Sequence, residues 1–340
     1  MRHFYVLFVV LILLLATTLT GCNPISSTGS GATEMNTAET TAEEATAEPA
    51  EEAAAVATEE PAEESADEEA TSDEESGEDA AAEEAAEPMF MDFDPANFTD
   101  STNIDNEWSP LQPGMQWVYE GESLDGEELV PHRIEFTVTD LTKEIDGVRV
   151  VVAWVVDTIN EEEIVESELS FYAQDDDGTV WYFGEYPEEY EGGEFVAAPT
   201  WIAGLEEAKP GVKMVKEPTV GMPVYYQGWG PAVEWSDFSI VSHMEDEVCI
   251  PVDCYTDVLV VDESSLGEVG AFQQKLYAKG VGNIKVEWTG EDATQETLEL
   301  VELNQLDADS LAEVHAAAME QEARAYANSP EVYGQTNPLE

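Results

Sequence analysis

The pattern of apolar and polar positions changes character three times along this chain. Residues 4–16 form a continuous apolar run, whereas residues 23–88 contain almost no large apolar side chains. Residues 89–306 alternate between apolar and polar positions, with turn residues between the alternating runs. Residues 307–340 repeat apolar side chains at helical spacing. The pattern therefore predicts a leader, a linker, a β-rich domain and a helical end.

Alternation with a period of two predicts about a dozen strands in the β-rich segment. In residues 133–139, Ile134, Phe136 and Val138 fall on one face and polar residues on the other. Residues 148–156 are apolar on both faces, which predicts a central strand covered on each side. The other predicted strands are residues 116–121, 164–173, 179–186, 194–201, 223–228, 236–248, 255–262, 271–279, 283–288 and 296–303.

Turn signals between these runs indicate hairpins. Asp146-Gly147, Asp177-Gly178 and Gly192-Gly193 separate runs about ten residues apart, which favours an antiparallel meander over βαβ units. Residues 203–222 are rich in turn signals, and we expect no strand there. The predicted fold class is mainly β: an antiparallel meander forming a curved sheet, a half-barrel or a sandwich, with a disordered N-terminal linker and a C-terminal helix.

The C-terminal segment predicts one helix. Asp309 or Ser310 can cap it, and Leu311 and Val314 begin a weak apolar stripe that runs to about residue 327. We expect this helix to lie on the sheet and the tail after it to fray.

The leader has the features of a secretory signal peptide. Its apolar run is shorter than a membrane span of about 20 residues and follows a positive Arg2. The sequence Leu19-Thr20-Gly21-Cys22 then resembles the bacterial lipoprotein box, which implies a lipid on Cys22 and cleavage before it. Residues 1–22 are thus the predicted lipoprotein signal region. Cleavage would leave Cys22 as the new N-terminal residue. The predicted location is the cell membrane, lipid-anchored and facing outside the cytoplasm. An ordinary secretory peptide or an uncleaved anchor is the alternative.

The linker, residues 23–88, cannot bury enough apolar surface to offset its conformational entropy, so we expect it to be disordered. It contains 22 Asp or Glu residues and no Lys or Arg. As a flexible coil it would span on the order of 45 Å. It would act as a spacer between the membrane and the β-domain.

The β-domain is acidic in its own right. Of 76 Asp and Glu residues and 11 Lys and Arg residues, 54 and 10 lie beyond residue 88, a net charge of −44. Phosphate recognition needs clustered Lys and Arg, so nucleic acid is an improbable partner. Solubility or life at high salt explains this acidity, and affinity for cations or for a basic partner is the alternative.

Two cysteines remain after Cys22. Cys249 and Cys254 flank a turn-like Pro251, and in an oxidising compartment this pair indicates one disulfide. A redox pair or half of a metal site is the weaker alternative, because the spacing is not CxxC.

No catalytic signature is present, and we predict neither a catalytic residue nor a cofactor: the sequence has no GxSxG elbow, Walker loop or HExxH motif. We predict no metal site either. Asp175 and Asp177, followed by Gly178, form a weak calcium candidate, but a hairpin turn requires the same residues.

Aromatic side chains beside glycines mark the one candidate ligand loop. Tyr226, Trp229 and Trp235 could stack on a sugar ring or an apolar ligand. The alternative is that they fold back and plug the core.

Several blocks resemble a family of uncharacterised secreted and lipid-anchored bacterial proteins. They are FDPANFTDSTNIDNEWSPLQPGMQWVYEGE, PHRIEFTVTDLTKEIDGVRVVV, FYAQDDDGTVWYFGEYPEEYEGGEFVAAPTWIAG, YYQGWGPAVEW, CIPVDCYTDVLV and KLYAKGVGNIKV. The resemblance covers nearly all of residues 93–303. It implies a predominantly antiparallel β-domain and no established activity.

Three functions fit these patterns, in this order. The first is a non-enzymatic binding or interaction module of unknown ligand, attached to the membrane through the lipid on Cys22. The second is a carrier that holds a hydrophobic ligand or a lipoprotein in a half-barrel cavity lined by uncharged apolar residues. The third is a secreted carbohydrate-active hydrolase, which requires two carboxylates in one cleft, one of them with a raised pKa.

Overall fold

The computed structural model of the chain describes residues 87–340 except residues 127 and 161. The predicted leader, the lipidation residue Cys22 and the linker up to residue 86 lie outside the described residues. The described part forms one sheet of fifteen strands and one long helix, α1 (Ala308–Asn328). No helix in the described ranges is long and apolar enough to cross a membrane.

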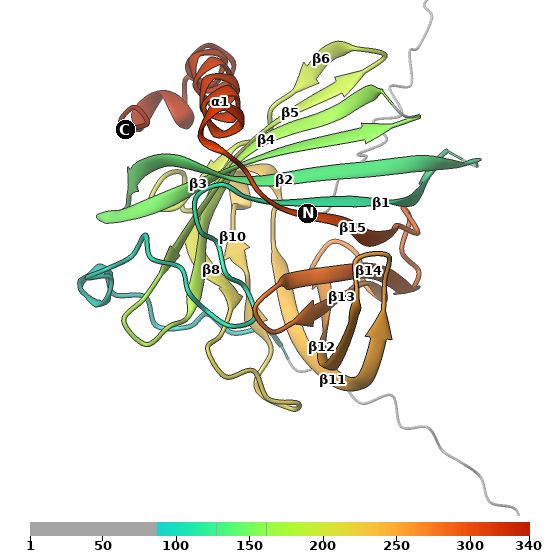
Figure 1. Ribbon diagram of the computed structural model, residues 1–340. Helices are drawn as coiled ribbons and strands as arrows, with labels where there is room; N and C mark the ends of the chain where they lie inside the picture. Colours follow the sequence, from blue (N-terminus) through green and yellow to red (C-terminus); the bar gives the residue numbers. More distant parts are fainter. Residues whose placement is uncertain (1–86, 127, 161) are drawn as a thin grey trace, which may run out of the picture. The chain divides into compact units, whose positions relative to one another are not determined.

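All strand pairs in the sheet are antiparallel, as the meander prediction required (Figure 1). The strands of the first half are β1 (Met115–Asp125), β2 (Glu128–Ile145), β3 (Val148–Ile159), β4 (Glu163–Gln174), β5 (Val180–Glu191), β6 (Glu194–Ala197), β7 (Trp201–Ile202) and β8 (Lys209–Met214). The strands of the second half are β9 (Tyr225–Tyr226), β10 (Gly228–Trp229), β11 (Asp237–Cys249), β12 (Cys254–Ser265), β13 (Ala271–Ala278), β14 (Gly282–Gly290) and β15 (Thr297–Gln305).

The sheet is strongly curved and nearly closed, and the strand order shows where its two ends meet. It runs β10-β8-β5-β4-β3-β2-β1-β15-β14-β13-β12-β11-β9. Its two end strands, β9 and β10, are separated in the chain by the single residue Gln227, so the two ends of the sheet are brought close together. The prediction of a curved antiparallel sheet is confirmed. Strand β8 lies within the segment for which the sequence predicted only turns.

We call the place where β8, β9 and β10 meet the seam of the sheet. Gly211 on β8 allows the backbones to approach closely there. A Cβ atom at this position would lie 2.3 Å from the backbone nitrogen of Gly228 and 2.4 Å from the carbonyl carbon of Gln227. Both are backbone atoms and cannot swing aside as a flexible side chain would. The seam therefore requires glycine.

Replacing Gly211 with alanine is expected to lower the free energy of unfolding by about 1–3 kcal/mol, the usual cost of overpacking. Urea denaturation followed by tryptophan fluorescence measures the change. Gly267→Ala is the matched control, because the nearest atom to its new Cβ is the Ser265 hydroxyl oxygen at 3.9 Å. Equal stability of the two variants would contradict the close approach at the seam.

The central strand β3 is covered on both faces, as its apolar pattern predicted. On one side α1 packs against β2 and β4, and Trp154 Nε1 on β3 donates a 2.9 Å hydrogen bond to Gln321 Oε1 of the helix. The helix begins two residues earlier than a cap at Asp309 would place it, because Asp307 is the cap and its carboxylate accepts a hydrogen bond from the Ser310 N–H. The predicted position of the helix on the sheet is confirmed.

The tail after the helix does not fray, in contrast to the prediction. Glu340 and Thr142 exchange two backbone hydrogen bonds, and Tyr333 is fully buried. The fully buried Lys143 donates hydrogen bonds to Glu322 and to the carbonyl of Asn337, and its ammonium lies 4.3 Å from the centre of the Tyr333 ring. Sequence composition alone did not reveal this buried cation, which ties the tail to β2.

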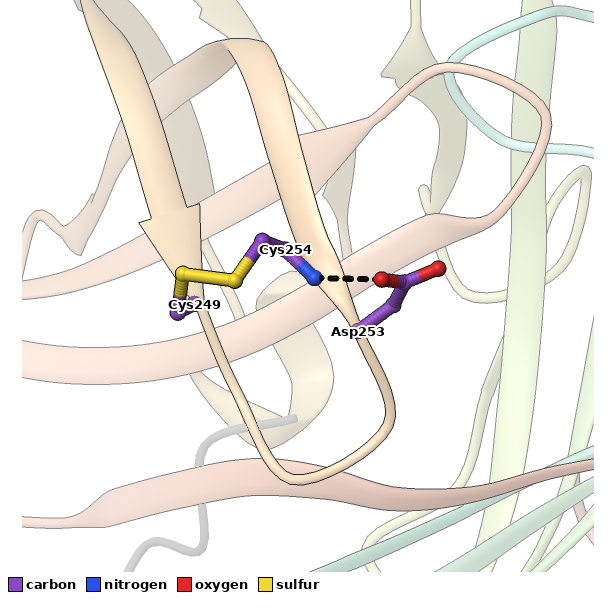
Figure 2. Close-up of a disulfide and its surroundings, with 3 residues drawn as sticks. All are labelled: Cys249, Asp253 and Cys254. Atoms are coloured by element: carbon purple, nitrogen blue, oxygen red, sulfur yellow. Dashed lines mark hydrogen bonds between the residues drawn. A yellow bond between two sulfur atoms is a disulfide. The ribbon is translucent and has the colours of Figure 1, made fainter.

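The predicted disulfide between Cys249 and Cys254 is present, and it closes the β11–β12 hairpin at its tip (Figure 2). The Asp253 carboxylate accepts a 2.8 Å hydrogen bond from the Cys254 N–H beside it. Because the loop between the cysteines is short, the cross-link stabilises the fold by roughly 2 kcal/mol in the chain-entropy account.

Candidate ligand-binding face

One face of the sheet is concave, and the strand register identifies its side chains. Residues opposite each other in register share a face, and Glu168 on β4 is linked in this way through Val155 and Phe136 to Trp117 on β1. Side chains of this face also meet across the sheet. Strands β8 and β13 are far apart in the strand order, yet Lys213 Nζ on β8 lies 3.4 Å from the Tyr277 hydroxyl on β13. We call this concave surface the inner face.

The first polar group of the inner face is a pair of carboxyls joined by a tyrosine. The Tyr182 hydroxyl lies 3.3 Å from Glu168 Oε1 and makes a shorter hydrogen bond with Glu185. Burial and the nearby charge of Glu168 raise the pKa of Glu185 well above its ordinary value. Glu185 is therefore harder to ionise than a carboxyl in water, and the carboxyl of Glu168 lies close to it.

The second group is centred on Glu263 of β12. This carboxylate forms an ion pair with Lys275 and accepts a 2.6 Å hydrogen bond from Gln227 Nε2. Burial alone would raise the pKa of Glu263, but the charges of Lys275 and Lys213 outweigh burial and lower it to about 2. Glu263 is therefore ionised at every physiological pH.

The third group is an imidazole between two carboxylates. His132 Nε2 lies 2.5 Å from Asp157 Oδ1, and His132 Nδ1 lies 3.1 Å from Glu296 Oε1. The Gln273 side-chain amide donates a short hydrogen bond to Glu296. Burial would lower the pKa of His132, but the hydrogen bonds and charges of Asp157 and Glu296 raise it to about 9. The imidazole is thus a buried cation at neutral pH.

The three groups adjoin one another. Asp157 of the third group is the register partner of Glu166 on β4, whose charge also acts on Glu185. Gln273 is the register partner of Glu263.

Gln227 of the second group also donates a 2.7 Å hydrogen bond to the Ser239 hydroxyl on β11. Asp237 lies two residues before Ser239 on this strand, and its charge contributes to the raised pKa of Glu185 in the first group. The groups therefore form one continuous belt around the inner face. We call it the polar belt, and its ionisable members are Asp157, Glu166, Glu168, Glu185, Asp237, Glu263, Glu296, His132, Lys213 and Lys275.

Aromatic side chains line the inner face beside this belt. Consecutive ring contacts connect Trp117, Phe136, Tyr172 and Tyr182, with centroid distances of 5.7, 6.1 and 4.8 Å. Tyr182 continues the series to Trp235 at 5.7 Å. We call this series the aromatic band. Because Tyr182 also contacts Glu168 and Glu185, the band adjoins the carboxyl pair.

The structure separates the three predicted ligand aromatics. Trp235 is buried and belongs to the aromatic band of the inner face. Tyr226 and Trp229 are half-buried, and both contact Phe90 of the segment before β1, with ring centroids 4.4 and 6.2 Å apart. Two of the three therefore pack against the chain itself.

The residues of the weak calcium candidate have structural partners. Asp175 Oδ1 accepts hydrogen bonds from the backbone N–H groups of Asp177 and Thr179, and Oδ2 accepts one from Trp181 Nε1. Within residues 87–340, apart from the two gaps, no group of three or more His, Cys, Asp or Glu side chains is arranged to hold a metal ion. The geometry here is that of a hairpin turn.

The polar belt was not predicted from the sequence, although one signal for it was present. In β4, Glu166, Glu168 and Ser170 alternate with Ser167, Leu169 and Phe171. Such a polar stripe normally faces solvent. Here β4 is the direct neighbour of β3, which the sequence already placed under cover on both faces. A strand beside it is covered in the same way, so its polar stripe is buried.

Comparisons with known proteins give a limited likeness. No protein-family model matches the chain, and no curated protein is significantly similar to it. One similar solved structure is a protein from Bacteroides fragilis, assigned as exported and having a YmcC-like fold. The two sequences are 14% identical, and the structures align with a TM-score of 0.35 over 58% of this chain and 99% of the other. Another is a protein from Parabacteroides distasonis, assigned as a lipoprotein. The two sequences are 14% identical, and the structures align with a TM-score of 0.35 over 61% of this chain and 100% of the other. At this distance the family resemblance of the sequence blocks remains a prediction.

Proposed function

We propose that this protein is a lipid-anchored, extracytoplasmic binding protein that holds its ligand on the inner face and catalyses no reaction. The polar belt is the observation that supports this function. Burying ionised groups costs several kcal/mol each, and well-packed apolar residues often stabilise a fold as well or better. A sheet that places ten ionisable side chains on its concave face departs from the rule for a stable core. Such departures are expected at functional sites.

The belt gives little support to a carrier of apolar ligands. That function calls for a cavity lined by uncharged apolar side chains. On the inner face, the carboxyls of Glu168 and Glu263 lie among the aromatic residues, so the lining of this face is not uncharged. A ligand with polar groups suits this face better.

A thermal-shift screen of the full chain against four ligand classes tests the binding function. The classes are small cations, small anions, neutral sugars and fatty acids. We expect one class to raise the melting temperature, because a ligand that binds only the folded state stabilises it. The rise should be lost in Glu166→Gln, on the inner face, and kept in Glu299→Gln, which lies on the opposite face of β15 and pairs with Lys285. A screen with no responding class would count against a binding function.

The membrane anchor is tested separately. Cell fractionation should place the wild-type protein in the membrane pellet and Cys22→Ser in the soluble extracytoplasmic fraction, because one lipid-modified residue makes the attachment. Metabolic labelling with a fatty-acid analogue should mark only the wild type. If Cys22→Ser remained in the membrane pellet, the lipid anchor would be wrong.

A carbohydrate-active hydrolase is the second candidate, and the carboxyl pair favours it. Glu185 has a raised pKa beside Glu168, which is the combination of acid and carboxylate that glycoside hydrolysis uses. Chromogenic glycosides measure this activity directly. Turnover that is lost in both Glu168→Gln and Glu185→Gln, but kept in Glu299→Gln, would establish an enzyme in place of a binding protein.

A further inference from the structure

We propose that an open edge of strand β11 binds an extended segment of a basic partner protein, which adds to the sheet as a further strand. The site is residues 243–248, which we call the β11 edge. These residues are exposed or half-buried, whereas the inner face is buried, so the inference goes beyond the binding function proposed above. Three features support it: an unpaired strand edge, exposure on both faces, and the order of side chains along the edge.

Strand β11 has a partner along its whole length on one side only. It pairs with β12 from Asp237 to Cys249, whereas β9 pairs with it only at Phe238 and Ser239. Among the residues that the structure describes, no strand pairs with the β11 edge on this second side. Such an edge presents unpaired N–H and C=O groups, to which an extended chain can add.

The β11 edge is also exposed on both faces. Successive side chains of a strand point to opposite faces, so a strand that covers a core alternates in burial. Strand β11 does so from Asp237 to Val241, but residues 243–247 are all exposed. The Cys249–Cys254 disulfide joins β11 and β12 at the end of their hairpin (Figure 2). A two-stranded ribbon is marginally stable by itself, so this cross-link keeps the edge extended before a partner binds.

The two faces of the β11 edge carry different side chains. Glu245 and Glu247 share one face, and Met244, Asp246 and Val248 share the other. An added strand places its own side chains beside these on the same two faces. Cationic side chains would pair with the glutamates, and apolar side chains would cover Met244, which is 44% exposed. A segment in which cationic and mostly apolar residues alternate therefore complements this edge.

Charge makes this chain itself an unsuitable occupant of the β11 edge. The edge contains three acidic residues and no Lys or Arg, and the 54 acidic and 10 basic residues beyond residue 88 give a net charge of −44. A second copy would place the same acids against each other, which is destabilising. The linker, residues 23–88, has no Lys or Arg to offer. The occupant that fits is a basic segment of another protein.

Fluorescence anisotropy of the full chain with the labelled peptide Lys-Val-Lys-Thr-Lys-Val-Lys tests the inference. As a strand, this peptide has its lysines on one face and its other side chains on the opposite face, and it has the same order in both directions. The matched peptide has proline in place of the valines and threonine, which keeps every charge but removes backbone donors and disfavours a strand.

We expect the first peptide to bind at about 0.15 M salt, and the proline peptide to bind at least about tenfold more weakly. The salt screens attraction by the acidic surface as a whole. Equal binding of the two peptides, or no binding of either, would overturn strand addition at the β11 edge.

Two charge-reversed variants locate the site. Glu245→Lys/Glu247→Lys should weaken binding of the first peptide at least about tenfold, because its lysines lose their partners. Glu313→Lys/Glu320→Lys changes the net charge equally at exposed positions of α1 and should leave the affinity nearly unchanged. Equal losses in the two variants would show attraction by overall charge alone and overturn the site.

Hydrogen exchange of the full chain gives a readout that attraction by charge does not change. The bound peptide should slow exchange of backbone N–H groups in residues 243–248 and leave α1 unchanged, because an added strand pairs the free groups of the edge. Unchanged exchange in residues 243–248 at saturating peptide would overturn the inference.

Discussion

Replacing Lys275 with methionine is expected to lower the free energy of unfolding by about 3–5 kcal/mol, the cost of leaving a buried charge without its partner. Lys275 and Glu263 are both almost fully buried and form an ion pair on the inner face. Methionine keeps the length and apolar stem of lysine but removes its charge. Glu263 would then have to stay ionised without the charge of Lys275, or take up a proton.

The double variant Lys275→Met/Glu263→Gln separates the lost ion pair from lost packing. It should recover a large part of the stability, because no buried charge then lacks its partner. Lys285→Met is the matched control: Lys285 lies on the neighbouring strand β14, faces the other side and pairs with Glu287 at 2.8 Å near solvent. Surface pairs of this kind contribute about 0–1 kcal/mol. Urea denaturation at pH 7 measures all three variants, and equal losses for Lys275→Met and Lys285→Met would contradict a buried pair.

The fold class could be predicted because strand signals are local. Alternation in residues 133–139 and the turn at Asp146-Gly147 each depend on a few neighbouring residues, and both recur in β2 and its hairpin with β3. The disulfide followed from cysteine count and spacing. The same reasoning missed β8, because Pro210 and Gly211 are turn residues elsewhere. Here Gly211 is required by the close approach of another strand, which no local pattern reveals.

The candidate site could not be predicted for a related reason. Its residues come from distant parts of the chain, and each is unremarkable alone: His132, Glu263 and Gln273 sit on strands whose polar positions normally face solvent. Only closure of the sheet turns these positions inward. The conspicuous loop aromatics Tyr226 and Trp229 pack instead against Phe90. Composition drew attention to aromatics and cysteines, whereas seven of the ten members of the belt are Asp or Glu, the chain's commonest charged residue types.

Because acidic residues are abundant along the whole chain, the sequence did not distinguish the exposed carboxylates from the buried ones. On the surface, carboxylates such as Glu245 remain solvated and contribute to solubility. On the inner face, Glu168 and Glu263 are 2% exposed and need partners. Sequence analysis left solubility and affinity for cations as alternatives for the acidity of the whole domain. The structure places the two sets of carboxylates on opposite faces of one sheet, so a single explanation for the acidity of the whole domain does not cover both.

Stability is expected to fall by on the order of 3 kcal/mol as the pH rises from 6.5 to 9, because His132 favours the folded state only while it is protonated. Its pKa is raised from 6.5 to about 9 in the folded chain. Below pH 6.5 the imidazole is charged in both the folded and unfolded states, and its contribution is fully present. Between these pH values only the folded state holds the proton, so the contribution decreases, and above about pH 9 it is lost. Asp157 and Glu296 are the two carboxylates that cause this shift.

Urea denaturation at several pH values between 6 and 9.5, for the wild type and for His132→Gln, measures this contribution. The wild type should lose stability across this window, whereas the variant should be less stable at pH 6 and lose much less as the pH rises. His243→Gln is the control, because the His243 side chain is 47% exposed and lies outside the buried group of His132, Asp157 and Glu296. Proton NMR of the imidazole gives an independent reading of the His132 pKa. A midpoint near 6.5 would show that Asp157 and Glu296 do not hold a charged imidazole between them.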